Sequence, residues 1–261
     1  MTRLLEDKNA IIYGAGGGIG SGVARTFARE GARLYLAGRT RAPLEALAAE
    51  ITATGGTADV EVLDALDEQA VTGHADRVAA AGGIDVSFNL VTRGDVQGVP
   101  LLGMAAEDLL RPVESGLRGA FVTARAAARH MVERGSGVIL YLTSGSSAGL
   151  APMMGGTGPA DAAVETFMRY LAAEVGPSGV RVVGLWTAGV PETLDAEKLR
   201  MVGGDNVPPP EVIEAAIAGQ AMLRRAPRLA QVAETAAFLA SDRAAAITAS
   251  IVNVTSGLVS R

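Results

Sequence analysis

The stretch Ala10-Ile11-Ile12-Tyr13-Gly14-Ala15-Gly16-Gly17-Gly18-Ile19-Gly20 decides the fold of this chain. It begins with apolar residues of the kind that form a short buried strand. Glycines follow, and the segment from Ser21 to Glu30 then carries apolar residues at helical spacing. A strand, a glycine turn and a helix in this order direct unpaired backbone N–H groups at a phosphate. The stretch therefore predicts a nucleotide-binding turn, with an ordinary tight turn as the alternative.

The glycine spacing in this stretch is Gly14-x3-Gly18-x-Gly20. Glycine suits such a turn because it adopts unusual φ angles and because a side chain would block the close approach of a pyrophosphate. The spacing differs from the GxGxxG pattern of the commoner dinucleotide fingerprint, and the turn lacks the lysine of a P-loop. These residues exclude a P-loop fold, and the rest of the chain must decide between the two remaining interpretations.

The composition narrows the class of protein. The chain has 261 residues, of which 49% are hydrophobic, which is enough for a sizeable core. The net charge is −5 and the arginines are scattered, so we expect no nucleic-acid partner. There is no cysteine, and His74 and His130 lie far apart, so we expect no disulfide and no metal site. We interpret both histidines as surface or helix-end residues.

The sequence carries no sign of a membrane protein. The residues Arg3, Glu6, Asp7 and Lys8 precede the first apolar run, which is unlike a signal peptide. No uninterrupted apolar run approaches the ~18 residues that span a bilayer. We therefore expect a cytoplasmic protein with no membrane partner.

Apolar runs and helical periodicities alternate along the whole chain. After the first strand, the predicted strands cover residues 33–37, 58–63, 84–90, 138–143, 180–186 and 250–255. After the first helix, the predicted helices cover residues 43–51, 67–81, 114–133, 159–175, 211–222 and 230–240. This alternation predicts a doubly wound parallel sheet with helices on both faces, the Rossmann fold of the α/β class. We expect a single domain over residues 1–261.

Ligands bind such sheets beyond the carboxyl ends of the strands. Arg39 follows the second predicted strand, at a position where an acidic residue usually accepts from the ribose of NAD. An arginine after Gly38 leaves room and positive charge for a 2′-phosphate, which favours NADP(H) over NAD(H). A solvated loop arginine is the alternative. Asp64 ends the third predicted strand, where it can hold the adenine amino group or simply form a turn.

In their order and spacing, these segments resemble the short-chain dehydrogenase/reductase family over nearly all of the chain. The matching motifs are Gly14-x3-Gly18-Ile19-Gly20, Asp64, Ile84-Asp85-Val86 ahead of Asn89, Ser144, Ala162-Ala163-Val164-Glu165, Leu171-Ala172-Ala173-Glu174-Val175-Gly176-Pro177, Gly179-Val180-Arg181-Val182, Gly189-x3-Thr193, Phe238-Leu239-Ala240-Ser241-Asp242 and Ile247-Thr248. The resemblance implies hydride transfer between NAD(P)(H) and an alcohol or carbonyl of a small molecule. It implies that the cofactor-binding residues are Gly14, Gly18, Ile19, Gly20, Arg39, Asp64, Asn89 and Thr193.

The family uses a tyrosine as general acid/base, a lysine four residues later that lowers the pKa of that tyrosine and binds the nicotinamide ribose, a serine that polarises the carbonyl, and an asparagine in a proton relay. The resemblance places the serine at Ser144, the tyrosine at Thr157, the lysine at Asp161 and the asparagine near Gly116. Three of the four roles are therefore unfilled. Neither lysine of the chain lies four residues after any of its four tyrosines, so no shift of register restores the pair.

Two interpretations of Thr157-Gly158-Pro159-Ala160-Asp161 follow. In the first, the segment only starts a helix, with threonine as N-cap, proline in the first turn and aspartate complementing the helix dipole. In the second, Asp161 accepts from ribose hydroxyls or acts as a general base, whereas Thr157 is too weak an acid to replace a phenol.

A rival class is excluded, because Gly145-Ser146-Ser147-Ala148-Gly149 matches the elbow of serine hydrolases but no histidine follows it.

The segment from about 191 to 210 shows little periodicity, and the matching region of the family is the substrate lid. Its apolar residues favour an apolar or mixed substrate. The family's helices at 114–133 and 159–175 form subunit contacts, so we expect a homodimer or homotetramer.

The sequence leaves two functions open. One is an NADP(H)-dependent oxidoreductase, or a non-redox enzyme, with weak, altered or substrate-assisted chemistry, and the other is a non-catalytic NADP(H)-binding subunit or sensor.

Overall fold

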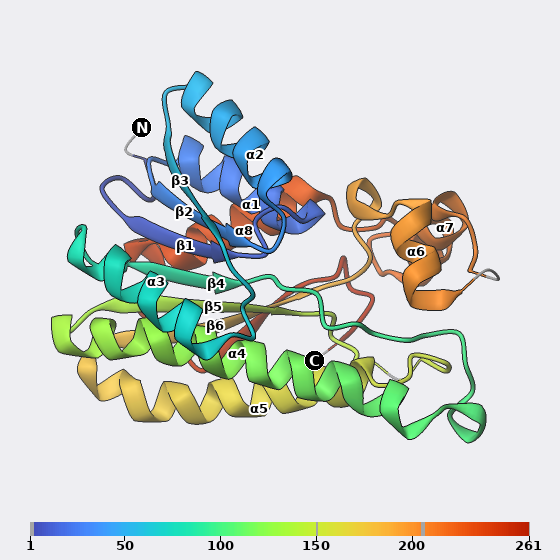
Figure 1. Ribbon diagram of the computed structural model, residues 1–261. Helices are drawn as coiled ribbons and strands as arrows, with labels where there is room; N and C mark the ends of the chain where they lie inside the picture. The colour runs from blue at the N-terminus through green and yellow to red at the C-terminus, as the bar shows by residue number, and fades with distance from the viewer. Residues whose placement is uncertain (1–2, 150, 205–206, 261) are drawn as a thin grey trace.

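The computed structural model of the chain describes residues 3–149, 151–204 and 207–260. Seven strands form one parallel sheet in the order β3-β2-β1-β4-β5-β6-β7 (Figure 1). The strands are β1 (Asn9–Tyr13), β2 (Arg33–Gly38), β3 (Thr57–Val62), β4 (Val86–Asn89), β5 (Gly137–Thr143), β6 (Val180–Thr187) and β7 (Ser250–Val254). The chain winds from β1 outward to β3 and then returns to β4 on the other side of β1, so the winding reverses between β1 and β4.

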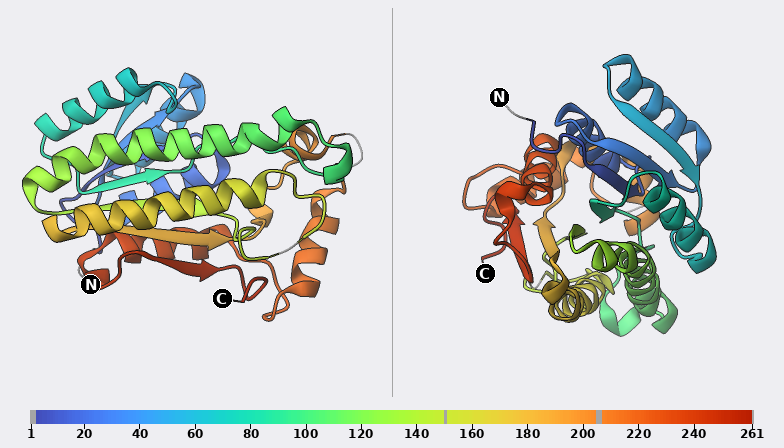
Figure 2. Two further views of the ribbon diagram at one scale, coloured as in Figure 1. Left: turned by 90° about the horizontal axis from the view of Figure 1, so that it is seen from below. Right: turned by 90° about the vertical axis from the view of Figure 1, so that its left-hand side faces the viewer.

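Helices cover both faces of the sheet, which confirms the predicted doubly wound fold (Figure 2). The helices are α1 (Gly18–Arg29), α2 (Arg41–Ala53), α3 (Glu68–Ala80), α4 (Ala106–Arg134), α5 (Thr157–Val175), α6 (Ala196–Gly203), α7 (Pro210–Gln220) and α8 (Leu229–Ala240). Residues of α1, α2 and α8, such as Phe27, Leu44 and Leu239, belong to one apolar core. Residues of α3, α4 and α5 form the core on the other face, where Met131 and Met168 are buried.

The buried centre of the sheet explains why its strands are continuous apolar runs. In β1, the residues Ala10 to Tyr13 are completely buried. Ile12 lies between Leu36 of β2 and Phe88 of β4 in the parallel register. A strand that has helices above and below it has no solvent face, so it has no polar alternation.

Two helices begin earlier than the sequence predicts. Helix α1 starts at Gly18, within the glycine turn, and not at Ser21. Helix α4 starts at Ala106 and not at 114, although Pro112 lies inside it. A proline in the interior of a helix removes one i→i−4 hydrogen bond. Pro112 is buried beside Gly156, where an added Cβ would lie 2.6 Å from Pro112 Cγ.

The segment after β6 is more regular than its sequence suggests. It contains helix α6, which begins where the Asp195 side chain accepts from the backbone N–H of Lys198 at 2.8 Å. Helices α6 and α7 lie at the right of Figure 1, beyond the carboxyl ends of the strands. No helix within the described ranges combines the length and the apolar character needed to cross a membrane.

Candidate functional site

The glycine turn joins the end of β1 to the start of α1, and its glycines are required by close packing. Gly14 has φ +78°, and a Cβ there would lie 2.6 Å from the carbonyl oxygen of Leu90. A Cβ at Gly20 would overlap the carbonyl oxygen of Gly14. The helix is thereby drawn tightly onto the turn. The first backbone N–H groups of α1, including those of Gly18 and Ile19, have no acceptor within the helix, and a helix start of this kind suits an anion.

Thr193 packs directly against this helix start. A Cβ at Gly18 would lie 2.8 Å from Thr193 Cγ2, so only glycine leaves room for the threonine. The hydroxyl of Thr193 donates to the carbonyl oxygen of Val190 at 2.9 Å, which fixes the turn that leads into α6. The structure thus brings two predicted cofactor residues, 175 positions apart in sequence, into contact.

A pocket opens beside the glycine turn, between the carboxyl ends of β1 to β4. It is lined by Tyr13, Gly14, Gly16, Gly17, Ala37, Gly38, Arg39, Thr40, Pro43, Leu44, Leu63, Asp64, Ala65, Leu90, Val91 and Thr92. The sequence predicts Gly14, Arg39 and Asp64 as cofactor residues, and all three lie on the wall of this one pocket. Its position at the reversal of winding is where ligands bind in open α/β sheets.

Each predicted residue of the pocket region has a defined local environment. Arg39 is exposed at the rim. The carboxylate of Asp64 accepts from the backbone N–H of Leu66 at 2.9 Å, so it does form a turn while it lines the pocket. Asn89 donates from Nδ2 to Thr123 Oγ1 at 3.1 Å and accepts from the backbone N–H of Val91 at 3.0 Å. The amide of Asn89 therefore ties β4 to α4.

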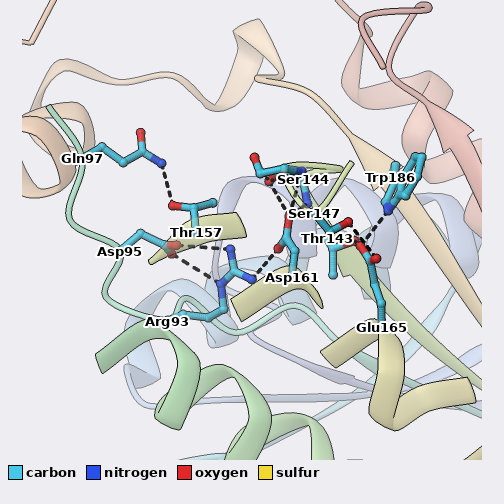
Figure 3. Close-up of polar contacts among 11 residues, drawn as sticks. Arg93, Asp95, Gln97, Thr143, Ser144, Ser147, Thr157, Asp161, Glu165 and Trp186 are labelled. Atoms are coloured by element: carbon cyan, nitrogen blue, oxygen red, sulfur yellow. Dashed lines mark hydrogen bonds and ion pairs between the residues drawn. The ribbon is translucent and has the colours of Figure 1, made fainter. Parts of the chain in front are cut away.

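Beyond β5, the carboxylate of Asp161 collects four hydrogen-bond donors (Figure 3). Its Oδ2 accepts from the backbone N–H groups of Ser144 and Ser146 at 3.0 and 3.1 Å and from the Ser144 hydroxyl at 2.7 Å. Its Oδ1 accepts from Arg93 Nη1 at 2.6 Å. Asp161 is completely buried. Asp161 lies beyond the first turn of α5, so it does not complement the helix dipole as predicted; its carboxylate instead organises the loop after β5.

Arg93 is the residue of this site that the sequence reasoning missed. Its guanidinium also pairs with Asp95, from Nη2 at 3.2 Å and from Nε at 3.4 Å. Burial opposes the charge of Arg93, but Asp95 and Asp161 outweigh it and hold the pKa of the guanidinium above its ordinary value. The available signal is their position: Arg93 and Asp95 follow closely after Asn89, which the resemblance marks as a cofactor residue.

Gly116 makes room for this arginine. A Cβ at Gly116 of α4 would lie 2.7 Å from Arg93 Cδ, so any larger residue requires Arg93 to move. Arg93 therefore fills the space beside the position at which the resemblance places an asparagine. Thr157, Gly116 and Asp161 all lie close to the Arg93 loop in the folded chain.

Thr157 does not cap helix α5, contrary to the prediction. The N-cap is Gly156, and Thr157 is the first residue of the helix, almost wholly buried. Its Oγ1 accepts from Gln97 Nε2 at 3.1 Å. The backbone N–H of Gln97 donates to the carbonyl oxygen of Val202 in α6 at 2.8 Å. Gln97, which the sequence reasoning also missed, thus links the start of α5 to α6.

A second buried carboxylate, Glu165, lies on α5 one turn beyond Asp161. It accepts from the hydroxyls of Thr143 and Ser147 at 2.8 Å each and from Trp186 Nε1 at 2.7 Å. The hydroxyl of Ser147 is thereby directed at a carboxylate, which agrees with the exclusion of a serine hydrolase.

His74 differs from its predicted surface position. It is buried on the inner face of α3, edge-on to Tyr13 and Tyr35. Burial lowers its pKa to about 4, although the nearby carboxylate of Glu61 opposes the shift. His130, by contrast, is partly exposed, and its Nε2 lies 2.8 Å from Asp76.

The parallel sheet with a glycine turn after its first strand defines a protein of the Rossmann class. A family model described as enoyl-(acyl carrier protein) reductase matches residues 14–259. The L-rhamnose 1-dehydrogenase (NAD(P)(+)) of Azotobacter vinelandii is 35% identical over 209 residues, which cover 75% of this chain and 78% of that protein.

Solved structures agree with this match. A short-chain type dehydrogenase/reductase from Mycobacterium ulcerans superposes with a TM-score of 0.87 at 26% identity, over 97% of this chain and 90% of that one. A gluconate 5-dehydrogenase from Burkholderia cenocepacia, in complex with NADP and tartrate, superposes with a TM-score of 0.84 at 25% identity, over 98% and 97% of the two chains. The chain belongs to the short-chain dehydrogenase/reductase family.

Proposed function

We propose that this protein binds NADP(H) in the pocket beside the glycine turn and transfers hydride between it and an alcohol or carbonyl of a small molecule. The observation that carries the proposal is the convergence of Gly14, Arg39 and Asp64 on one pocket next to the open end of α1. Backbone N–H groups there suit a pyrophosphate, and Arg39 suits a 2′-phosphate. NAD(H) is the alternative. The relatives named above act with NAD(P) or hold NADP, which supports this class of cofactor.

The proposed proton-transfer site departs from that of the family. By the resemblance, Thr157 and Asp161 stand where the family has its tyrosine and lysine, and neither supplies a phenol or an ammonium group. Asp161 is paired with Arg93, and an arginine does not release its proton near neutral pH. Positioned acids and bases contribute ~10²–10⁴-fold to rate. We therefore infer weak turnover of simple carbonyls, and a role for Ser144 and Asp161 with substrates that bring their own acid group.

A non-catalytic NADP(H)-binding subunit or sensor is the second candidate. It is favoured by the hydrogen bonding of Asp161, whose two oxygens already accept from four donors inside the protein. In either function we propose that residues 1–261 act as one domain, that the segment at about 191–210 is the substrate lid, and that the protein is a homo-oligomer.

Calorimetric titration of the full chain with NADPH, NADP, NADH and NAD tests the cofactor. We expect NADPH or NADP to bind most tightly. NADPH consumption with a panel of ketones, and NADP reduction with the matching alcohols, then separate the two candidates. Turnover with any pair supports the oxidoreductase, whereas tight binding without turnover supports the sensor. Binding of none of the four nucleotides would contradict both.

A further inference from the structure

Polar side chains gather around Asp161 in what we call the Asp161 cluster. They are those of Arg93, Asp95, Ser144, Ser146, Thr157 and Asp161. The guanidinium of Arg93 pairs with Asp95 at 3.2 Å and with Asp161 at 2.6 Å, as Figure 3 shows. One guanidinium and two carboxylates leave a formal charge of −1 on the cluster. Asp161 is completely buried, whereas the side chain of Asp95 is 17% exposed, so Asp95 is the carboxylate that a ligand can approach.

Cations on the neighbouring segments do not cancel this charge. Arg111 of α4 pairs with Asp108 at 2.9 Å, and Lys198 of α6 pairs with Asp195 at 2.7 Å. Arg200 of α6 is exposed to solvent, where salt screens its charge. The surroundings of the Asp161 cluster therefore favour a positively charged ligand over a neutral one.

The Asp161 cluster adjoins the proposed cofactor pocket. Thr92 lines that pocket, and Arg93 is the next residue of the loop after β4. Farther along this loop, the backbone N–H of Gln97 donates to the carbonyl oxygen of Val202 in α6 at 2.8 Å. A substrate held between the pocket and α6 therefore lies along the part of the loop that carries Asp95.

None of the side chains of the Asp161 cluster releases a proton near neutral pH. Arginine stays protonated, and the carboxylates paired with it are ionised acceptors. The N–H groups that donate to Asp161 favour this ionised form. Serine and threonine hydroxyls are not acids in this range. Because hydride reduction of a carbonyl leaves an alkoxide that needs a proton, the cluster is poorly suited to a neutral C=O acceptor.

We propose that the hydride acceptor of this site is an iminium ion, a cationic C=N group, which the protein reduces to an amine. The iminium carbon receives the hydride of NADPH, the π electrons of the C=N bond become the lone pair of nitrogen, and the products are a neutral amine and NADP⁺. This step consumes no proton, so it does not need the acid that the cluster lacks. The positive charge of the acceptor is complementary to the carboxylate of Asp95. The inference rests on the proposed binding of NADP(H) and goes beyond it by naming the class of acceptor.

The first experiment measures binding to the full chain without nucleotide, so that no hydride is transferred. Its probes are the N-methyl-dihydroisoquinolinium ion, a permanent iminium cation, and α-tetralone, a neutral ketone with the same two fused rings. Attraction between unit charges about 4 Å apart corresponds to about fivefold in affinity even at the dielectric constant of water. We therefore expect the cation to bind at least about fivefold more tightly by ligand-observed nuclear magnetic resonance.

Variants of Asp95 assign this preference to its charge. Asp95→Asn should remove the preference, whereas Asp95→Glu, which keeps the charge, should retain it. Asp59→Asn is the matched control and should leave the preference unchanged, because Asp59 also pairs with an arginine, Arg33 at 3.0 Å, but near the amino ends of the strands. If Asp95→Asn does not fold, the two affinities of the unaltered protein still decide.

The second experiment follows NADPH consumption with both probes, corrected for the reaction without protein. Positioned acids contribute ~10²–10⁴-fold to rate and only the ketone needs one, so we expect kcat for the iminium ion to exceed kcat for the ketone ~100-fold or more. Asp95→Asn should raise KM for the iminium ion and leave KM for the ketone unchanged.

Four outcomes overturn the inference. They are equal or tighter binding of the ketone to the unaltered protein, binding of neither probe, a preference for the cation that persists in folded Asp95→Asn, and iminium turnover no faster than ketone turnover. Rapid turnover of the ketone would overturn the inference while supporting the proposed oxidoreductase. Failure to bind any nucleotide overturns the proposed function, and the nucleotide titration reveals it separately.

Discussion

At the scale of single residues, Arg39 and Arg93 differ in exposure and in whether protein carboxylates already bind them. Arg39 is an exposed guanidinium at the rim of the proposed cofactor pocket, so its charge is available to a ligand. Arg93 has a side chain that is 17% exposed, and two carboxylates of the protein already bind it. In the proposed function the first arginine bears on which nucleotide binds, whereas the second holds the carboxylate of Asp161.

Arg39→Ala should weaken NADPH binding about tenfold or more and leave NADH binding unchanged. One charge-assisted hydrogen bond contributes ~1.5–3 kcal/mol, and only NADPH carries the 2′-phosphate that would receive it. Isothermal titration of both nucleotides measures the change. Arg41→Ala is the matched control, since Arg41 is a neighbouring exposed arginine that pairs with Glu45. An equal loss of affinity for both nucleotides would show that Arg39 does not bind the 2′-phosphate.

At the scale of elements, hydrogen bonds join three segments. They are the start of α5, the loop after β4 and the loop after β5. Asp161 of α5 holds the backbone of Ser144 and Ser146, Arg93 holds Asp161, and Gln97 holds Thr157. A substitution at one of these positions therefore removes hydrogen-bond partners from residues of the other elements. This coupling decides how the family's proton-transfer pair can be restored.

The pair Thr157→Tyr and Asp161→Lys should not produce carbonyl reduction by itself. A lysine at 161 meets the guanidinium of Arg93 at the place where Asp161 now accepts from it, and two cations there repel each other. Adding Arg93→Ala should release the site and raise NADPH-dependent ketone reduction ~100-fold or more over the double variant. The same triple variant with phenylalanine at 157 is the control for the phenol. Activity already present in the double variant would refute this account of Arg93.

Helix α3 introduces a pH dependence of stability through His74. Burial lowers the pKa of this histidine from 6.5 to about 4, so the folded state takes up its proton only near pH 4. Between pH 6.5 and 4 the unfolded state binds more protons, and the free energy of unfolding falls as the pH falls. The full effect is roughly 3 kcal/mol. Urea unfolding at neutral and mildly acidic pH measures it.

His74→Phe keeps an aromatic ring against Tyr13 and Tyr35 and removes the titration, so it should flatten this part of the pH profile. His130→Phe, at a partly exposed histidine, should retain it. An unchanged slope in His74→Phe would mean that other groups cause the acid sensitivity.

At the scale of the whole molecule, α4 and α5 lie side by side along one flank (Figure 2). Phe121 of α4 packs edge-on against Phe167 of α5, and Tyr170 beside them is 68% exposed. Phe121→Asp combined with Tyr170→Asp should convert the proposed homo-oligomer to a monomer, because two charges would be buried in the contact. Light scattering with size-exclusion chromatography measures the mass. Met222→Asp with Leu223→Asp alters exposed apolar residues elsewhere and should leave the mass unchanged.

The sequence by itself determined the sheet, the two helical layers and the glycine turn. Apolar runs, helical periodicity and glycines are local signals, and buried parallel strands make them strong. The same signals missed the first residues of α4, which begins at Ala106 and contains Pro112. They also failed for His74, because a single residue does not reveal which face of its helix is buried.

Only the tertiary structure decided the arrangement around Asp161. Sequence reasoning singled out Ser144, Thr157 and Asp161, but it treated Asp161 as a helix-start residue or a free carboxylate. Its partner Arg93 is 68 positions away in sequence and comes from the loop after β4. Hydrogen bonds between side chains of distant loops depend on where the strands place those loops. No local pattern encodes that placement, so the pairing of Arg93 with Asp161 appears only when the chain is folded.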